Sequence, residues 1–356
     1  NDAGGVAGGR SLIQVTENDQ TNPDVAVSAY QKLLDRDVPV IFGPAFSDAV
    51  LAVEDLIRGG QTLTIGFSTT SPALTELDDD GYFIRTVPSD AVQSIVLADL
   101  IAAEAPDQPL CAVYRDDSYG SALADEVIAH LPDGTDVTEA PYDPEDADLA
   151  SVLDPCDDLI AGEAALLFVT LQADGSFLID DAGERGWTTE RHRVFLTDGA
   201  KDQEIVNQLV HPELVEGALG TTSSGPDPST ADGERLTAFR ARFEDRFGRA
   251  PEIYMEHVYD AVYVAAMAIE IAGSTEDHEA IRDALGSICG GAEGEAGDWS
   301  SIADAIDGDG EVDYTGASGA VCFDADSGDV LSPYYIGVWT VMDGTIADER
   351  VECVGC

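Results

Sequence analysis

The stretch IGFSTTSPALTELDDDGYFIRTVPSD, residues 65–90, joins two apolar runs through a row of hydroxyl side chains. The first run ends in the Ser and Thr residues 68–71, and Pro72 then stops regular structure. A polar surface turn is one interpretation, because Ser and Thr build turns in any fold. A ligand site is the other, because α/β sheets bind ligands at the carboxyl ends of their strands.

Strand-like and helix-like segments alternate along the chain. Short apolar or β-branched runs predict strands, and apolar residues recurring every three or four positions predict helices. The predicted strands are residues 11–17, 38–42, 62–67, 110–114, 164–171, 193–196, 321–323 and 334–341. The predicted helices are residues 23–37, 47–58, 89–105, 118–131, 175–185, 231–247, 253–272 and 276–287. This alternation predicts parallel sheets covered by helices, with surface loops at 143–158 and 289–299.

The composition restricts the partners of the chain. Its 356 residues are enough for two domains, and 70 Asp and Glu against 17 Lys and Arg give a net charge of −53. Such a charge repels nucleic acids and anionic membranes, so neither is an expected partner. No apolar stretch is long enough to span a bilayer. Salt screens self-repulsion, so the acidity suits a protein of saline surroundings or an ordinary soluble secreted protein equally well.

The cysteine count is even, which favours disulfides over metal ligands in an acidic and possibly exported chain. The six cysteines are Cys111, Cys156, Cys289, Cys322, Cys353 and Cys356. They can pair in many ways. The preferred pairs are Cys111–Cys156 and Cys289–Cys322, which leaves the two C-terminal cysteines to each other. Cys111 starts a predicted strand and Cys156 precedes the strand expected beside it.

Polar side chains follow several predicted strands. Ser47 comes after the run VIFGPAF, Ser68 and Thr70 end the strand that begins near residue 62, and Tyr119 and Asp198 follow two later strands. Each has a structural explanation by itself, since Ser47 can cap a helix and Tyr119 can pack in a core. Together they offer hydroxyl donors for a carboxylate, and a carboxylate for an ammonium group.

Motifs of catalysis and metal binding are incomplete. Residues 307–313 resemble a calcium loop, but Val312 stands where the loop needs Gly and Ser318 where it needs Glu. Residues 316–319 lack a glycine of the nucleophile elbow, and the five histidines show no metal spacing. We therefore expect no enzyme activity, no cofactor and no metal. A hydrolase is the less favoured alternative, because no nucleophile–base pair is recognisable.

Seven stretches carry a resemblance to a known family: NDAGGVAGGRSLIQVTENDQTNPDVAVSAYQKLL, VIFGPAFSDAV, STTSPALT, GYFIRTVPSD, YRDDSYGSALADEV, FLTDG and YDAVYVAAMAIEIAG. With these stretches in this order, the chain resembles the type I periplasmic solute-binding proteins of branched-chain amino-acid (Leu/Ile/Val) ABC transporters. The resemblance implies two Rossmann-like α/β lobes joined by a three-strand hinge, with the ligand in the cleft between them. Lobe 1 would comprise residues 1–88 and 226–330, and lobe 2 residues 89–225 and 331–356.

The resemblance also implies a ligand site. Three hydroxyl residues of lobe 1 would bind a carboxylate, Asp198 would bind an α-amino group, and Tyr119 would add a contact from lobe 2. Gln172 falls near a further contact position. The implied ligand-binding residues are Ser47, Ser68, Thr70, Tyr119, Gln172 and Asp198. On this interpretation the hydroxyl row of residues 68–71 binds ligand, and residues 85–90 form the first crossing between lobes.

The implied function is that of an extracytoplasmic solute-binding protein, periplasmic or extracellular and monomeric. It would capture an amino acid or related small carboxylate by lobe closure and deliver it to an ABC permease. A sensory ligand-binding domain of the same fold is the alternative. Members of the family begin with a strand and a helix ahead of the NDAGG segment, so we expect the native protein to carry further residues there. No signal peptide is visible in the sequence.

Overall fold

The computed structural model describes residues 4–146 and 148–356 and divides into two compact units. Unit 1 comprises Asn1–Ser89, Ser224–Tyr335 and Cys353–Cys356, and unit 2 comprises Asp90–Ser223 and Ile336–Glu352. Each unit is thus assembled from separate stretches of the chain, as a two-lobed α/β architecture requires.

The chain crosses between the units close to the positions expected for the lobes. The first crossings follow Ser89 and Ser223, and the third follows Tyr335, a few residues beyond the expected one. The final residues differ from expectation, since Cys353–Cys356 belong to unit 1. There Gly355 approaches Ser332 so closely that an added Cβ would lie 3.0 Å from the Ser332 Cβ.

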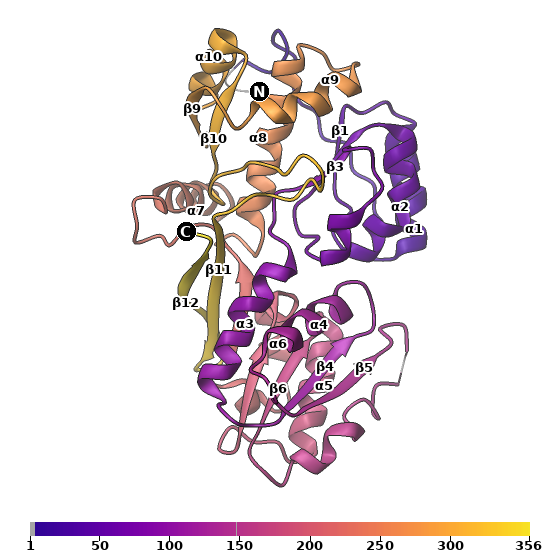
Figure 1. Cartoon of the computed structure of the whole chain (residues 1–356), viewed down its shortest axis with the longest axis vertical. Helices are drawn as coiled ribbons and strands as arrows, with labels where there is room; N and C mark the ends of the chain where they lie inside the picture. The colour runs from indigo at the N-terminus through magenta and orange to yellow at the C-terminus, as the bar shows by residue number, and fades with distance from the viewer. Residues whose placement is uncertain (1–3, 147) are drawn as a thin grey trace. The chain divides into compact units, whose positions relative to one another are not determined.

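Unit 1 is built on a parallel sheet with the strand order β1-β2-β3. Its strands are β1 (Val40–Phe42), β2 (Leu63–Gly66) and β3 (Phe83–Arg85). The flanking helices are α1 (Pro23–Leu34), α2 (Ser47–Gly60), α8 (Met255–Ala272) and α9 (His278–Asp283). Ile41 and Phe83 pack with α1 and α2, which lie side by side in Figure 1, whereas Leu63, Ile65 and Ile84 pack with α8. Because helices cover both faces, β2 and β3 are buried at every position rather than at alternate ones.

A second, two-stranded sheet takes its first strand from residues 289–299, which were predicted to be a loop. Its elements are β9 (Ala292–Glu295), α10 (Trp299–Asp309) and β10 (Val312–Thr315), and α7 (Glu234–Phe247) belongs to the same unit. The prediction of a flexible loop at 289–299 is wrong there, because β9 pairs in parallel with β10. The glycines permit this pairing: a Cβ on Gly294 would lie 2.5 Å from Val312 Cγ2.

Two predicted strands are not strands in the structure. Residues 11–17 lie outside every strand of the described part of the chain, and Leu12, Ile13 and Val15 are exposed, Ile13 at 84%. An alternating apolar pattern favours a strand where its apolar face is buried, and here those side chains are exposed, so the pattern alone was insufficient. Residues 321–323 form only an isolated bridge, from Phe323 to Val330.

Unit 2 contains a sheet with the strand order β12-β11-β8-β7-β6-β4-β5. Its strands are β4 (Leu110–Arg115), β5 (Val137–Tyr142), β6 (Ala164–Val169), β7 (His192–Leu196), β8 (Leu219–Ser223), β11 (Tyr334–Met342) and β12 (Thr345–Val354). Strands β4 to β8 are parallel, and β11 runs antiparallel to β8. The turn before β12 is Asp343-Gly344, with φ angles of 51° and 70°, as tight hairpins prefer.

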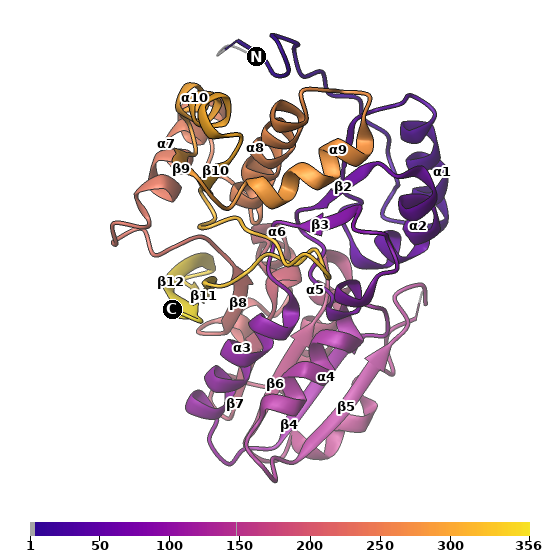
Figure 2. The ribbon, with the colours of Figure 1, turned by 45° about the horizontal axis from the view of Figure 1, so that its top comes forward.

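Helices cover this sheet as the alternation predicted. They are α3 (Asp90–Glu104), α4 (Gly120–His130), α5 (Gln172–Glu184) and α6 (Gln203–Gln208). Helices α3 and α4 pack side by side, with α4 against β4 and β6 (Figure 2). Leu178 and Ile179 of α5 join a core with Phe168 and Trp339. None of the helices in the described part of the chain has the length and apolar content of a membrane span.

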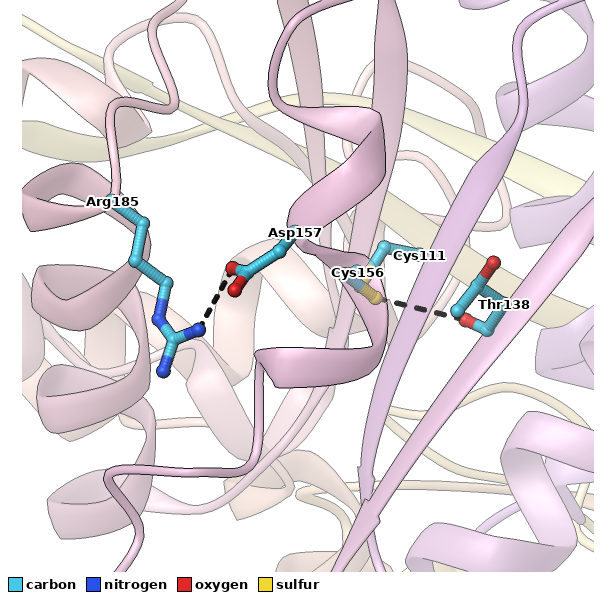
Figure 3. Close-up of a disulfide and its surroundings, with 5 residues drawn as sticks. All are labelled: Cys111, Thr138, Cys156, Asp157 and Arg185. Carbon is cyan, nitrogen blue, oxygen red and sulfur yellow. Dashed lines mark hydrogen bonds and ion pairs between the residues drawn. A yellow bond between two sulfur atoms is a disulfide. The ribbon is translucent and has the colours of Figure 1, made fainter.

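The six cysteines form the three preferred pairs, Cys111–Cys156, Cys289–Cys322 and Cys353–Cys356. The first joins β4 to the 3₁₀ helix η2 (Asp154–Leu159), and both of its cysteines are buried (Figure 3). The expectation that residues 143–158 form a solvated connection is therefore wrong for its last part. Leu153 is buried as well, and it anchors the segment to the core of unit 2.

Arg185 holds the same segment from the other side (Figure 3). Its guanidinium donates to Asp154 at 2.9 Å, to Asp157 at 2.8 Å and to Asp181 of α5 at 2.8 Å. Partial burial lowers the pKa of Arg185, but the hydrogen bonds to Asp157, Asp154 and Asp181 outweigh it and raise that pKa above its ordinary value. One cation thus neutralises a group of carboxylates that would otherwise repel one another.

We predict unequal contributions from the disulfides to stability. Replacing Cys111 and Cys156 by Ala opens a loop with a sequence separation of 45, which lowers the free energy of unfolding by about 4 kcal/mol in the chain-entropy model. Replacing Cys353 and Cys356, separated by 3 positions, should cost less than half as much, about 1.5 kcal/mol. Denaturant unfolding of both double variants measures the difference. Equal losses, or alkylation of several thiols in the unreduced parent, would contradict this account.

We predict that the effect of replacing Arg185 depends on salt. Arg185→Met leaves three carboxylates without their shared cation, so it should lower the free energy of unfolding by about 2 kcal/mol at low ionic strength. Molar KCl screens the remaining repulsion, and the loss should then shrink to less than about half. Thermal unfolding of parent and variant at KCl concentrations from about 0.1 to about 2 M gives both values. A loss that is the same at every salt concentration would refute a charge-neutralising role.

Candidate functional site

In unit 2, polar groups gather where β4 and β7 end. Tyr119 stands at the N-cap of α4, and Asp198 begins the 3₁₀ helix η3 (Asp198–Ala200) directly after β7 and Thr197. The Tyr119 hydroxyl donates to Asp198 Oδ1 at 2.9 Å and lies 3.0 Å from Thr197 Oγ1. The amide of Gly199 donates to the same tyrosine oxygen at 3.4 Å. Two of the predicted site residues are therefore in direct contact.

The protonation of Tyr119 follows from its surroundings. Burial raises the pKa of the Tyr119 phenol well above its ordinary value, and the neighbouring negative charge of Asp198 raises it further. The phenol therefore stays neutral at physiological pH and keeps the proton that it donates to Asp198. The carboxylate is held as a hydrogen-bond acceptor.

Gln93 is a third member of this group that the sequence analysis missed. It lies on α3, is fully buried, and donates from Nε2 to Asp198 Oδ1 at 2.9 Å. Two neutral donors therefore converge on one carboxylate oxygen. No sequence pattern identifies Gln93, because it precedes Asp198 by 105 positions and occupies an ordinary buried place in a helix.

In unit 1, Ser47 faces the hydroxyl row rather than capping its own helix. It is the first residue of α2, whose N-cap Phe46 makes no side-chain capping bond. The Ser47 hydroxyl accepts a hydrogen bond from the amide of Ser71 at 3.3 Å, and Ser47 is buried. The start of α2 and the end of the hydroxyl row are thus joined, which the capping interpretation of Ser47 does not explain.

The hydroxyl row itself is tightly folded. Ser68 donates its hydroxyl to the Ala45 carbonyl at 2.7 Å, and Thr70 is buried. The row turns back over the end of β2, where a Cβ on Gly66 would lie 2.3 Å from Thr69 Oγ1. Only glycine permits this close approach.

Arg85 supports the row from within unit 1 and was also missed. Its fully buried guanidinium donates to the Ser71 carbonyl at 2.8 Å, to Thr75 Oγ1 at 2.9 Å and to Asp329 Oδ1 at 2.6 Å. It also donates to the Thr69 carbonyl at 3.3 Å. The partner Asp329 is 244 positions away, so no local motif could connect the two. Arg85 fixes the carbonyls of the row and thereby the direction of its remaining groups.

The predicted residues therefore fall into two groups, one in each unit. Tyr119 and Asp198 lie together in unit 2, and Ser47, Ser68 and Thr70 lie at neighbouring strand ends in unit 1. Gln172 begins α5, but its side chain lies outside the part of the chain that the structure describes. Within the described residues, no cluster of three or more His, Cys, Asp or Glu side chains could hold a metal ion.

Comparison with known proteins gives a consistent result. The model of a family described as periplasmic binding protein matches residues 1–345. A chemotactic signal transduction system substrate-binding protein, BasB of Halobacterium salinarum, is 28% identical over 89% of this chain and 74% of its own length. The Leu/Ile/Val-binding protein homolog 3 of Brucella melitensis is 25% identical over 80% of this chain and 74% of its own.

A solved structure shares the fold across nearly the whole chain. The leucine-binding protein LivK of Thermotoga maritima superposes with a TM-score of 0.78 at 21% identity. The match covers 98% of this chain and 90% of that protein. At this identity the likeness concerns the fold, with its two lobes and mixed α/β sheets.

We predict that Arg85 stabilises unit 1 through its buried bonds. Arg85→Met leaves Asp329 and two carbonyls without their donor, so the free energy of unfolding should fall by about 3–5 kcal/mol. Arg282→Met is the matched control, because Arg282 pairs with Asp283 at a more exposed position and should cost less than about 1 kcal/mol. Chemical unfolding compares the two. A similar loss in both variants would show that the Arg85 network contributes little.

Proposed function

Because the chain belongs to the periplasmic binding protein family, we propose that it binds an α-amino acid, or a closely related small carboxylate, and delivers it to an ABC permease. The observation that carries this proposal is the Asp198 carboxylate, which Tyr119 and Gln93 hold as an acceptor through neutral donors. A carboxylate held in this way suits a ligand ammonium group, since charge-assisted bonds are among the strongest polar contacts.

Unit 1 offers the complementary chemistry. Ser47 and Thr70 provide hydroxyls beside the start of α2, and the N-cap of that helix carries no side-chain capping bond. Helix N-termini favour anions, because their first amides point outward and the helix dipole is positive there. A ligand carboxylate would take the place of the missing cap. An α-amino acid carries both charged groups, so each unit has a partner for one of them.

The names of similar proteins support an amino acid as the ligand class. The Brucella melitensis relative is named for leucine, isoleucine and valine, and the Thermotoga maritima structure is that of a leucine-binding protein. L-leucine is therefore the first probe, and 4-methylpentanoate, which is leucine without its amino group, is the matched analogue.

Sensing is a second candidate function, favoured by one observation. The Halobacterium salinarum relative, named as part of a chemotactic system, aligns with 89% of this chain. Deletion of the gene from the source cells distinguishes the two roles. Loss of amino-acid uptake supports delivery to a permease, whereas loss of the chemotactic response with uptake intact supports sensing.

We predict that Asp198→Asn weakens leucine binding by on the order of a hundredfold or more. Removing one partner of a buried ion pair costs roughly 3–5 kcal/mol, and a tenfold change in affinity corresponds to about 1.4 kcal/mol. Ser47→Ala should have a smaller effect, because one neutral donor to a charged acceptor contributes about 1.5–3 kcal/mol. Titration calorimetry of both variants with leucine provides the values.

The analogue separates ammonium recognition from general damage to the site. Asp198→Asn should bind 4-methylpentanoate about as well as the parent does, because that ligand has no ammonium group. Ser47→Ala should weaken leucine and 4-methylpentanoate alike, because both carry the carboxylate. Undiminished leucine binding by Asp198→Asn would overturn the amino-acid interpretation of the site.

A further inference from the structure

Gln93 has an unusual combination of contacts. Its Nε2 donates to Asp198 Oδ1, whereas its Oε1 has no hydrogen-bond partner among the described residues, although the side chain is fully buried. A buried amide oxygen without a partner lowers stability, because folding removes its hydrogen bonds to water and no hydrogen bond within the protein replaces them. An apolar side chain of similar shape would avoid that penalty.

The bond that Gln93 does make is directed at the proposed ligand-binding carboxylate. Gln93 and Tyr119 approach the same oxygen of Asp198, one from α3 and one from the N-cap of α4. Two donors on one oxygen fix the rotation of the carboxylate plane about its χ2 torsion, which is otherwise broad for Asp. A fixed carboxylate can bind an ammonium group without first losing rotational freedom.

We infer that Gln93 is a positioning residue, which holds the Asp198 carboxylate in the orientation that binds a ligand ammonium group. The inference rests on the proposed function and extends it, since it assigns part of the preference for amino acids over their deaminated analogues to a residue of α3. Gln93 serves binding at the expense of stability, as residues of functional sites often do.

The test uses Gln93→Met in the full chain, because Met has the length of Gln and lacks its donor. Leucine affinity should fall about tenfold or more, the effect of one donor to a charged acceptor. Affinity for 4-methylpentanoate should stay within about twofold, and the melting temperature should not fall, because the buried partnerless oxygen is gone. Ser94→Ala is the control: Ser94 is a buried neighbour on the same helix whose hydroxyl donates to the Ala91 carbonyl at 3.0 Å.

The Ser94→Ala protein should bind both probes as the parent does. Equal weakening of both probes by Gln93→Met, or of neither, would overturn the positioning role. So would a large fall in melting temperature, since Gln93 would then be a structural residue.

A measurement without ligand separates this inference from the proposed function. In nitrogen–proton correlation spectra, the Gln93 side-chain amide is identified as the signal absent from Gln93→Met. Its protons should exchange slowly with water in the parent and faster in Asp198→Ala, which removes the acceptor. An unchanged exchange rate in Asp198→Ala would overturn the inference by itself. Failure of the parent protein to bind leucine or any other α-amino acid would instead overturn the proposed function.

Discussion

The orientation of one carboxylate, Asp198, is the constraint on which the proposed binding depends. A charged group in a buried place is stable only when its hydrogen bonds are satisfied, and here Tyr119 and Gln93 supply neutral donors to one of its oxygens. These neutral donors add no positive charge of their own, so the negative charge of the carboxylate can still attract a ligand cation.

Unit 1 would bind the anionic group of the ligand, with the hydroxyl row as the source of hydrogen-bond donors. The backbone carbonyls of the row therefore need hydrogen-bond partners from elsewhere in the unit. Arg85 provides them from the buried side, and Asp329 balances its charge. In both units, therefore, the residues that would touch ligand are ordered by a second set of buried polar residues. Those supporting residues come from distant parts of the chain, and they determine how rigid each group is.

The sequence predicted the residues at strand ends well, because strand, turn and helix signals are local. The hydroxyl row, Tyr119 and Asp198 all stand where the alternation placed them. The supporting residues Gln93 and Arg85 were not predictable, since their roles depend on contacts over 105 and 244 positions. Residues 11–17 illustrate the converse, because their alternating pattern predicts a strand, whereas the structure leaves their apolar side chains exposed and forms no strand there. Whether the six implied ligand residues bind a solute remains a prediction.

The acidic composition gives these few cations unusual weight. The chain has 17 Lys and Arg against 70 Asp and Glu, and two of these few cations, the buried Arg85 and the partly buried Arg185, each bond several oxygens.

The central claim, that the chain carries an α-amino acid, is tested most directly by native mass spectrometry of the protein purified without unfolding. We predict a retained small molecule that reacts with amine-specific reagents after release. A retained ligand without an amino group would contradict the claim.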